Sequence, residues 1–88
     1  MNTLIIYGYE EQSVIVLLDE NEMILASDYA NGTMWTIENS LTKIFGEVKG
    51  TTLYTHLTTN CQINLIDYNL TNIYQYIFLD EYSFNKVK

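Results

Sequence analysis

The sequence predicts an α+β fold: a small single domain in which an antiparallel sheet packs against one central amphipathic helix. Three observations predict it. Short stretches of apolar and β-branched residues, separated by polar residues, fill the first 29 positions, a pattern typical of strands. Between residues 34 and 48 the apolar residues change to helical spacing. The chain has 88 residues, a length that buries only about 60–65% of the unfolded surface, so residues 1–88 are expected to form one domain.

Three strands are expected in the first third of the chain, at residues 3–9, 13–18 and 23–29. The pair Glu10-Glu11 ends the first strand. The four polar residues 19–22 separate the second strand from the third and predict a hairpin loop. The second strand contains the run V-I-V-L-L, which is apolar at every position. Both of its faces are therefore expected to be covered, as in a central strand.

A helix is predicted over about residues 34–48. Its apolar face is formed by Met34, Ile37, Leu41, Ile44, Phe45 and Val48. Thr33 precedes this pattern and is expected to cap the helix with its hydroxyl. Gly46 lies inside the pattern, and a glycine in a helix lowers helix stability by about 1 kcal/mol relative to Ala. The last turn is therefore expected to fray or bend. Gly50 is expected to close the helix in the left-handed conformation.

The C-terminal 38 residues predict three further elements. Residues 51–57 and 61–66 are expected to be strands around the turn Thr58-Thr59-Asn60, since Cys61, Ile63 and Leu65 alternate with polar residues. Residues 72–79 fit a helix by the spacing of their apolar residues and a strand by their β-branched and aromatic composition, and we favour the strand. The predicted order is therefore βββ-α-βββ, with a helix as the alternative for the last element.

Negative charge is concentrated in the N-terminal half. Residues 1–42 contain seven carboxylates and no Lys or Arg, whereas residues 43–88 contain four carboxylates and four lysines, so the whole formal charge of −7 belongs to the first half. This asymmetry predicts a surface that repels nucleic acid and attracts a basic partner. Direct nucleic-acid binding is not expected, because several cations are needed to neutralise phosphates.

The acidic and aromatic residues of this half are the predicted partner-binding residues. They are the carboxylates Glu10, Glu11, Asp19, Glu20, Glu22 and Asp28, expected to provide charge complementarity, and the aromatic residues Tyr7, Tyr9 and Trp35, expected to provide contact area. Two other interpretations of the same residues stay open. Loop carboxylates also keep a small domain soluble, and the aromatic residues also serve as ordinary packing between sheet and helix. The two acidic groups are expected to lie roughly 20–25 Å apart, and a DNA duplex carries about 14 charges over that distance. Seven carboxylates therefore favour a few contacts with a basic groove over a full imitation of DNA.

No catalytic residue, metal ligand or cofactor is predicted. His56 and Cys61 are the one histidine and the one cysteine, and a metal site needs three or four ligands. A Cys–His nucleophilic pair also needs an orienting group, for which Asp67 is the nearby acid. We therefore interpret His56 as a half-buried strand residue and Cys61 as a small core thiol. Glycine-rich phosphate loops and the G-x-S-x-G and H-E-x-x-H motifs are absent, so we expect no enzyme.

These observations predict a small acidic binding protein. The chain has no Arg and no Pro but ten Ile and eight Tyr, a bias typical of A/T-rich codons. In size, charge and this bias it is similar to small acidic proteins of phages and mobile elements that block host nucleases or defence complexes. The likeness implies an inhibitor of the anti-defence or anti-CRISPR type. Its expected partner is the basic surface of a nucleic-acid-handling protein, such as a nuclease or a defence complex.

We expect no membrane association, because no apolar run approaches the roughly 20 residues that span a bilayer. No basic segment precedes an apolar stretch near residue 1, and the single cysteine suits a reducing compartment, so a cytoplasmic location is expected, in the host cell if the protein is phage-encoded. The alternative function is a structural or assembly module that self-associates, for example as a homodimer, through strand edges and tyrosines.

Overall fold

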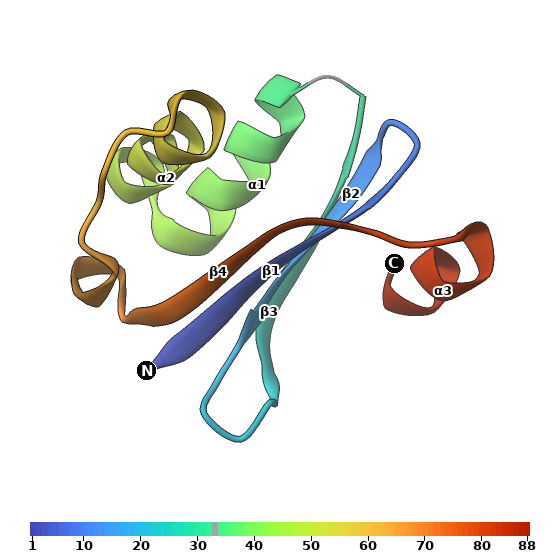
Figure 1. The fold of residues 1–88 in the computed structure, drawn as a ribbon, viewed down its shortest axis with the longest axis horizontal. Helices are drawn as coiled ribbons and strands as arrows, with labels where there is room; N and C mark the ends of the chain where they lie inside the picture. Colours follow the sequence, from blue (N-terminus) through green and yellow to red (C-terminus); the bar gives the residue numbers. More distant parts are fainter. Residues whose placement is uncertain (33) are drawn as a thin grey trace.

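A computed structural model describes the whole chain except Thr33, and of Met34 and Trp35 it describes the backbone but not the side chains. The cap predicted at Thr33 therefore lies outside the described residues. Four strands form a mixed sheet with helices on both of its faces (Figure 1). The elements are, in order, β1 (Asn2–Tyr9), β2 (Gln12–Leu18), β3 (Ile24–Asn31), α1 (Met34–Phe45), α2 (Glu47–Thr59), the 3₁₀ turn η1 (Leu65–Tyr68), β4 (Leu70–Phe78) and α3 (Glu81–Val87).

The three N-terminal strands are confirmed. β1 pairs antiparallel with β2 from Tyr9 opposite Gln12 to Thr3 opposite Leu18, and β2 pairs antiparallel with β3. Residues 19–22 connect β2 to β3, as predicted. The sheet order is β3-β2-β1-β4, so β2 is a central strand, and its continuous apolar run is explained by packing on both faces.

The helix predicted for residues 34–48 is confirmed as α1 up to Phe45, but it does not continue unbroken to residue 48, because the chain forms two helices. α1 ends at Phe45 and α2 begins at Glu47. Gly46 between them has φ 92°, a conformation that side chains disfavour, so the glycine breaks the helix instead of fraying it. Val48, the last residue of the apolar pattern, is 81% exposed. Gly50 does not end a helix but lies buried within α2.

The strands predicted at 51–57 and 61–66 are also wrong. Residues 51–57 belong to α2, which turns Gly50, Leu53 and Leu57 inward at helical spacing. The threonines that favoured a strand are accommodated on the helix surface, where their hydroxyls donate to carbonyls one turn back, as Thr55 does to Thr51 at 3.0 Å. Residues 61–64 have no regular structure and lead into η1.

The strand favoured for residues 72–79 is confirmed as β4, but it pairs parallel with β1. The α1–α2 segment returns the chain to the starting end of the sheet, and such a crossover produces parallel pairing. The sheet is therefore mixed and not antiparallel throughout. A bulge interrupts the pairing, since Ile5 lies opposite Tyr74 but Tyr7 lies opposite Ile77. Helix α3, which follows β4, was not predicted.

Each face of the sheet has its own apolar cluster. The larger one lies beneath α1 and α2 and contains nine buried residues: Leu4, Ile6, Ile15, Ala30, Ile37, Leu41, Leu53, Leu57 and Leu70. The smaller lies beneath α3 and contains three: Val14, Val16 and Phe84. In the described part of the chain, no helix has the length and apolar character needed to cross a membrane.

Candidate protein-binding surface

The predicted acidic residues gather at the two ends of the β1–β2 pair. Glu10 and Glu11 form the turn between the two strands, and Asp19, Glu20 and Glu22 form the loop between β2 and β3. Because β1 and β2 pair along their whole length, the two acidic groups lie at opposite ends of the sheet (Figure 1). This is the placement that the sequence predicts.

Asp28 is placed differently from the other predicted acids. It lies in the middle of β3 and faces α1, where its carboxylate accepts a hydrogen bond from the Ser40 hydroxyl at 2.5 Å. The Lys43 ammonium is 3.6 Å from the same carboxylate oxygen. These contacts join β3 to α1, which gives Asp28 a structural role.

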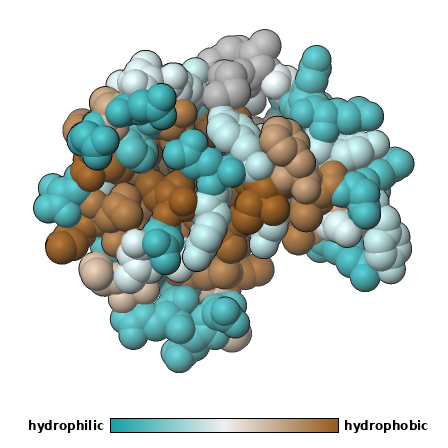
Figure 2. All heavy atoms as spheres, viewed as in Figure 1, coloured by the Kyte–Doolittle hydropathy of each residue, from teal (hydrophilic) through white to brown (hydrophobic). Residues whose placement is uncertain are grey.

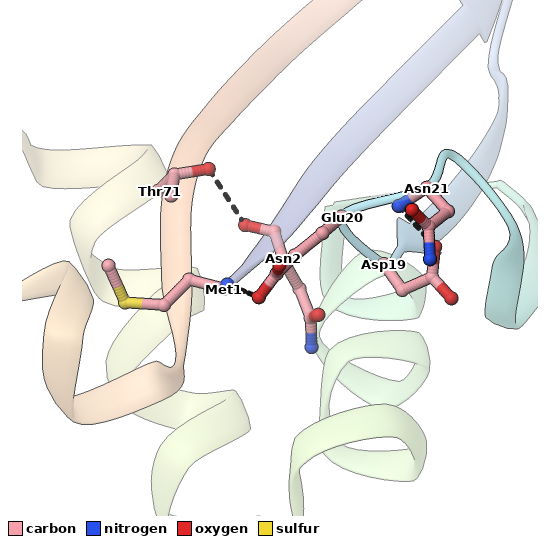
Figure 3. Close-up of polar contacts among 6 residues, drawn as sticks. All are labelled: Met1, Asn2, Asp19, Glu20, Asn21 and Thr71. Atoms are coloured by element: carbon pink, nitrogen blue, oxygen red, sulfur yellow. Dashed lines mark hydrogen bonds and ion pairs between the residues drawn. The ribbon is translucent and has the colours of Figure 1, made fainter.

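The β2–β3 loop is held in shape by its own carboxylates (Figure 3). Asp19 accepts hydrogen bonds from the backbone N–H groups of Asn21 at 2.8 Å and Met23 at 2.9 Å, as acidic residues commonly do in turns. The carboxylate of Glu20 lies 2.5 Å from the amino group of Met1. Glu22 adopts φ 64°, and its carboxylate has no hydrogen-bond or ion-pair partner among the described residues. The loop therefore presents negative charge from a defined backbone.

A surface hollow of about 550 Å³ lies beside this loop; we call it the hairpin-end hollow. It is lined by Met1, Thr3, Ile5, Leu18, Asp19, Glu20, Glu22, Thr71 and Tyr74. Thr3 pairs with Leu18 and Ile5 pairs with Tyr74 across neighbouring strands, so these four residues form a continuous floor. Tyr74 is 48% exposed. Three carboxylates thus border an accessible, partly apolar patch of the sheet.

The hairpin-end hollow exists because α3 covers only one end of this face. Residues alternate between the faces of a strand, so Thr3 and Ile5 share the α3 face with Tyr7 and Tyr9. Tyr7 and Tyr9 pack against the cluster beneath α3, whereas Thr3 and Ile5 line the hollow. A helix of seven residues is about 10 Å long and a strand of eight is about 26 Å long, so more than half of the strand length stays uncovered.

A second hollow, of about 390 Å³, lies at the other acidic end; we call it the turn-end hollow. Its described lining residues are Gly8, Glu10, Glu11, Gln12, Ser13, Gly32, Ile37, Tyr76 and Phe78. The rings of Tyr76 and Phe78 stack with centroids 6.5 Å apart. Tyr76 has φ 49° at the bulge of β4, and such bulges often redirect a side chain. Burial raises the pKa of Tyr76, with a smaller contribution from Tyr54.

The aromatic residues predicted as partner contacts have packing roles where they are described. The Tyr9 ring lies 5.8 Å from the ring of Phe84, and Tyr7 packs against the same cluster. Loss of solvent raises the pKa of Tyr9, and the carboxylates of Glu10 and Glu81 raise it further. The side chain of Trp35 lies outside the described residues.

The four lysines have partners of their own, although Lys86 also lines a smaller hollow that adjoins the hairpin-end hollow. Lys43 pairs with Asp28, and Lys49 donates to the Asp67 carbonyl at 3.1 Å. Lys86 and Lys88 lie over the rings of Tyr82 and Tyr29, at 4.4 and 4.6 Å. None of them is among the described residues that line the hairpin-end or turn-end hollow. Folding therefore preserves the charge asymmetry of the sequence at both ends of the sheet.

His56 and Cys61 meet at the C-terminal end of α2, so His56 is a helix residue and not the strand residue that was expected. The ring nitrogen Nδ1 of His56 contacts the backbone carbonyl of Cys61, and Asn60 between them adopts the left-handed conformation that ends the helix. Within the described part of the chain, no group of three or more His, Cys, Asp and Glu residues is arranged to hold a metal ion. The contact with the Cys61 carbonyl at the helix end gives His56 a structural role.

Comparison of the chain with protein-family models, with curated proteins and with solved structures finds no match. The surface itself is therefore the basis for the function proposed below.

The predicted binding residues do not include Tyr74, Tyr76 and Phe78, the residues of β4 that line the two hollows. Phe78 is 74% exposed, and Figure 2 shows hydrophobic residues across the β4 side of the molecule, above the hydrophilic β2–β3 loop. The signal was present as an aromatic residue at every second position from 74 to 78. The pairing of β4 with β1, which brings these rings near the acidic residues, was not predictable from that spacing.

Proposed function

We propose that this chain is a small acidic binding protein that docks on the basic surface of a nucleic-acid-handling protein and inhibits it. The observation that carries the proposal is the pairing of carboxylates with accessible apolar or aromatic side chains at both ends of the sheet. Glu10 and Glu11 border the turn-end hollow with Phe78, and Glu20 and Glu22 border the hairpin-end hollow with Tyr74.

Electrostatics supports a basic partner. Of the seven carboxylates in residues 1–42, Asp28 is paired with a lysine in the described structure, and Glu20 is paired with the Met1 amino group. The remaining negative charge faces solvent, where it accelerates the approach of a positively charged surface. Such a surface is normally the one that holds nucleic acid, so a protein bound there blocks access by the nucleic acid.

The apolar and aromatic side chains supply the second component of affinity. Exposed charge pairs each contribute little, about 0.2–1 kcal/mol, and weaken with salt. Stable complexes usually depend on a few buried aromatic or arginine contacts. Tyr74 and Phe78 are accessible beside the acids, and a lysine or arginine of the partner can place its charge near a carboxylate while its stem packs on the ring.

The proposal is tested by affinity capture from a lysate of a low-GC bacterium, followed by purification of each retained protein. Three baits are compared: the wild-type chain, a variant carrying Glu10→Gln, Glu11→Gln, Glu20→Gln and Glu22→Gln, and a matched control carrying Glu38→Gln, Glu47→Gln, Asp67→Asn and Glu81→Gln. Both variants lose four negative charges, but the control loses them outside the two hollows.

We expect wild type and control to retain a nucleic-acid-binding protein that the first variant loses, and moderate salt to release it. Added wild-type chain is then expected to displace labelled DNA or RNA from the purified partner in proportion to its occupancy. Identical capture by all three baits would contradict the proposal, and so would a partner that still holds its nucleic acid when saturated with the chain.

Self-association is the second candidate function, and one observation favours it. β4 is an edge strand of the four-stranded sheet, and its nine residues include no charged side chain, although charge is a common protection of strand edges. Sedimentation at several protein concentrations measures it directly. Phe78→Lys is expected to shift a dimer toward monomer, whereas Tyr82→Lys, an equally exposed site on α3, is expected to leave it unchanged.

A further inference from the structure

We infer that the hairpin-end hollow is the docking site for a basic amphipathic helix of the partner. The helix would lie on the uncovered half of the sheet face beside α3, with an apolar side chain on the floor and a lysine or arginine against the β2–β3 loop. This inference rests on the proposed function and specifies which of the two acidic ends makes the principal contact and what chemistry it recognises.

The floor suits an apolar side chain. Ile5 and Leu18 are half-buried, Tyr74 is 48% exposed, and strand pairing brings them together on one face. A neighbouring hollow of about 290 Å³ shares Leu18 and Glu22 with the hairpin-end hollow and adds the apolar residues Val16 and Ile24. The two hollows therefore adjoin at Leu18 and Glu22 and together form one groove, which extends along β1 from Thr3 to Tyr7 beside α3.

The shape of the face favours a helix as occupant. Sheet faces in α+β domains are covered by helices, and α3 already covers the other end of this face. The uncovered length of about 15 Å accommodates about ten residues of helix, or almost three turns. A partner helix there would continue the layer that α3 begins.

The charges around the groove give the helix its chemistry and direction. Glu22 and Glu20 border the groove at the loop, Glu20 being paired with the Met1 amino group, whereas Lys86 lines the far end beside α3. A cationic side chain is therefore favoured at the loop and disfavoured near Lys86. The free carboxylate of Glu22 lies where the two hollows meet, within reach of both, which makes it the preferred acceptor for a lysine or arginine.

A defined probe tests the inference without the natural partner: a synthetic helical peptide of about 18 residues, made of Leu, Lys and Ala, with Leu at helical spacing along one face. Two control peptides replace every Lys by Glu or every Leu by Ala. Binding to the isotopically labelled full-length chain is followed by NMR chemical shifts, which report both the affinity and the residues contacted.

We expect the largest shift changes at Thr3, Ile5, Leu18 and Tyr74, and no binding of the Glu peptide. Tyr74→Ser is expected to weaken binding about fivefold or more, whereas Tyr82→Ser, a control on the outside of α3, leaves it unchanged. Glu22→Gln is expected to weaken it about two- to fivefold, whereas Glu11→Gln at the opposite end has a smaller effect. The Ala peptide is expected to bind more weakly than the Leu peptide.

The outcomes separate this inference from the proposed function. Shift changes centred on Gly8, Tyr76 and Phe78 would place the peptide in the turn-end hollow. That result would overturn the hairpin-end site but would still support a basic partner. Equal binding of the Lys and Glu peptides would overturn both. Shift changes at the groove when the chain alone is concentrated would show that a second copy covers the face, which overturns the inference in favour of self-association.

Discussion

Replacement of Gly50 by Ala is expected to destabilise the fold, although Ala is the better helix former. Gly50 lies inside α2, where the change to Ala gains about 1 kcal/mol from helix propensity alone. A Cβ at this position would lie 2.5 Å from the Cα and 2.6 Å from the backbone nitrogen of Thr42, and 2.8 Å from the carbonyl carbon of Leu41. These are backbone atoms of α1, so no side-chain rotation relieves the overlap. The two helices must separate instead.

The magnitude follows from the packing between the helices. Leu41 of α1 and Leu53 of α2 are fully buried, and overfilling such a core costs typically 1–3 kcal/mol. Because the overlap involves backbone, we take the upper end and subtract the propensity gain, which leaves a loss of about 2 kcal/mol. For a domain of this size that loss lowers Tm by about 8–16 °C.

Thermal unfolding followed by circular dichroism measures the change, with urea unfolding as the second measure of the free energy. Thr51→Ala, at the next and exposed position of α2, is the control and is expected to change stability by less than about 0.5 kcal/mol. An increase in Tm for Gly50→Ala, the result expected of a helix glycine that contacts nothing, would refute close packing of α2 on α1 at this position.

Substitutions at three further positions test other contacts of the fold. Phe84→Ala removes the fully buried side chain of α3 and is expected to lower the free energy of unfolding in urea by about 3–4 kcal/mol. A decrease no larger than that caused by substituting an exposed residue would contradict the packing of α3 on the sheet. Asp28→Ala removes the acceptor of the Ser40 hydroxyl, which is 2% exposed, and is expected to cost about 1–2 kcal/mol, with Asp28→Asn costing less. Asp80 accepts a hydrogen bond from the Ser83 N–H at 2.7 Å, which lowers the pKa of Asp80, so its contribution to α3 is present above the ordinary pKa and lost as pH falls through the folded value. The chemical shift of the Ser83 amide in an NMR pH titration reports this loss. Asp80→Asn is expected to abolish the pH dependence of that shift.

The N-terminal half of the fold was predictable because local signals agree with the tertiary structure there. Alternation, a hairpin loop of polar residues and an uninterrupted apolar run in β2 each specify one arrangement, and the structure adopts it. The acidic residues at the strand ends were placed correctly for the same reason. Turns between short strands must lie at the ends of the sheet.

The segment from residue 46 to 66 was not predicted, because tertiary packing overrides weak propensity there. Its threonines and isoleucines favour strands, but Gly50, Leu53 and Leu57 have the spacing of a helix face and pack on α1. A break as short as one residue, Gly46, joins two helices whose apolar patterns run together in the sequence. The position of the break depends on packing of the two helices, which the pattern does not encode.

The two faces of the sheet explain why the principal binding surface is expected on the α3 face. The α1–α2 face holds nine buried residues from six elements, so two helices already cover most of it. The α3 face holds three, with Phe84 as the buried residue of a helix only seven residues long. Seven residues of helix are too short to cover the whole of this face. The uncovered part adjoins the β2–β3 loop, where the carboxylate of Glu22 has no partner among the described residues. Open apolar surface thus lies beside unneutralised negative charge, and a basic amphipathic partner complements both.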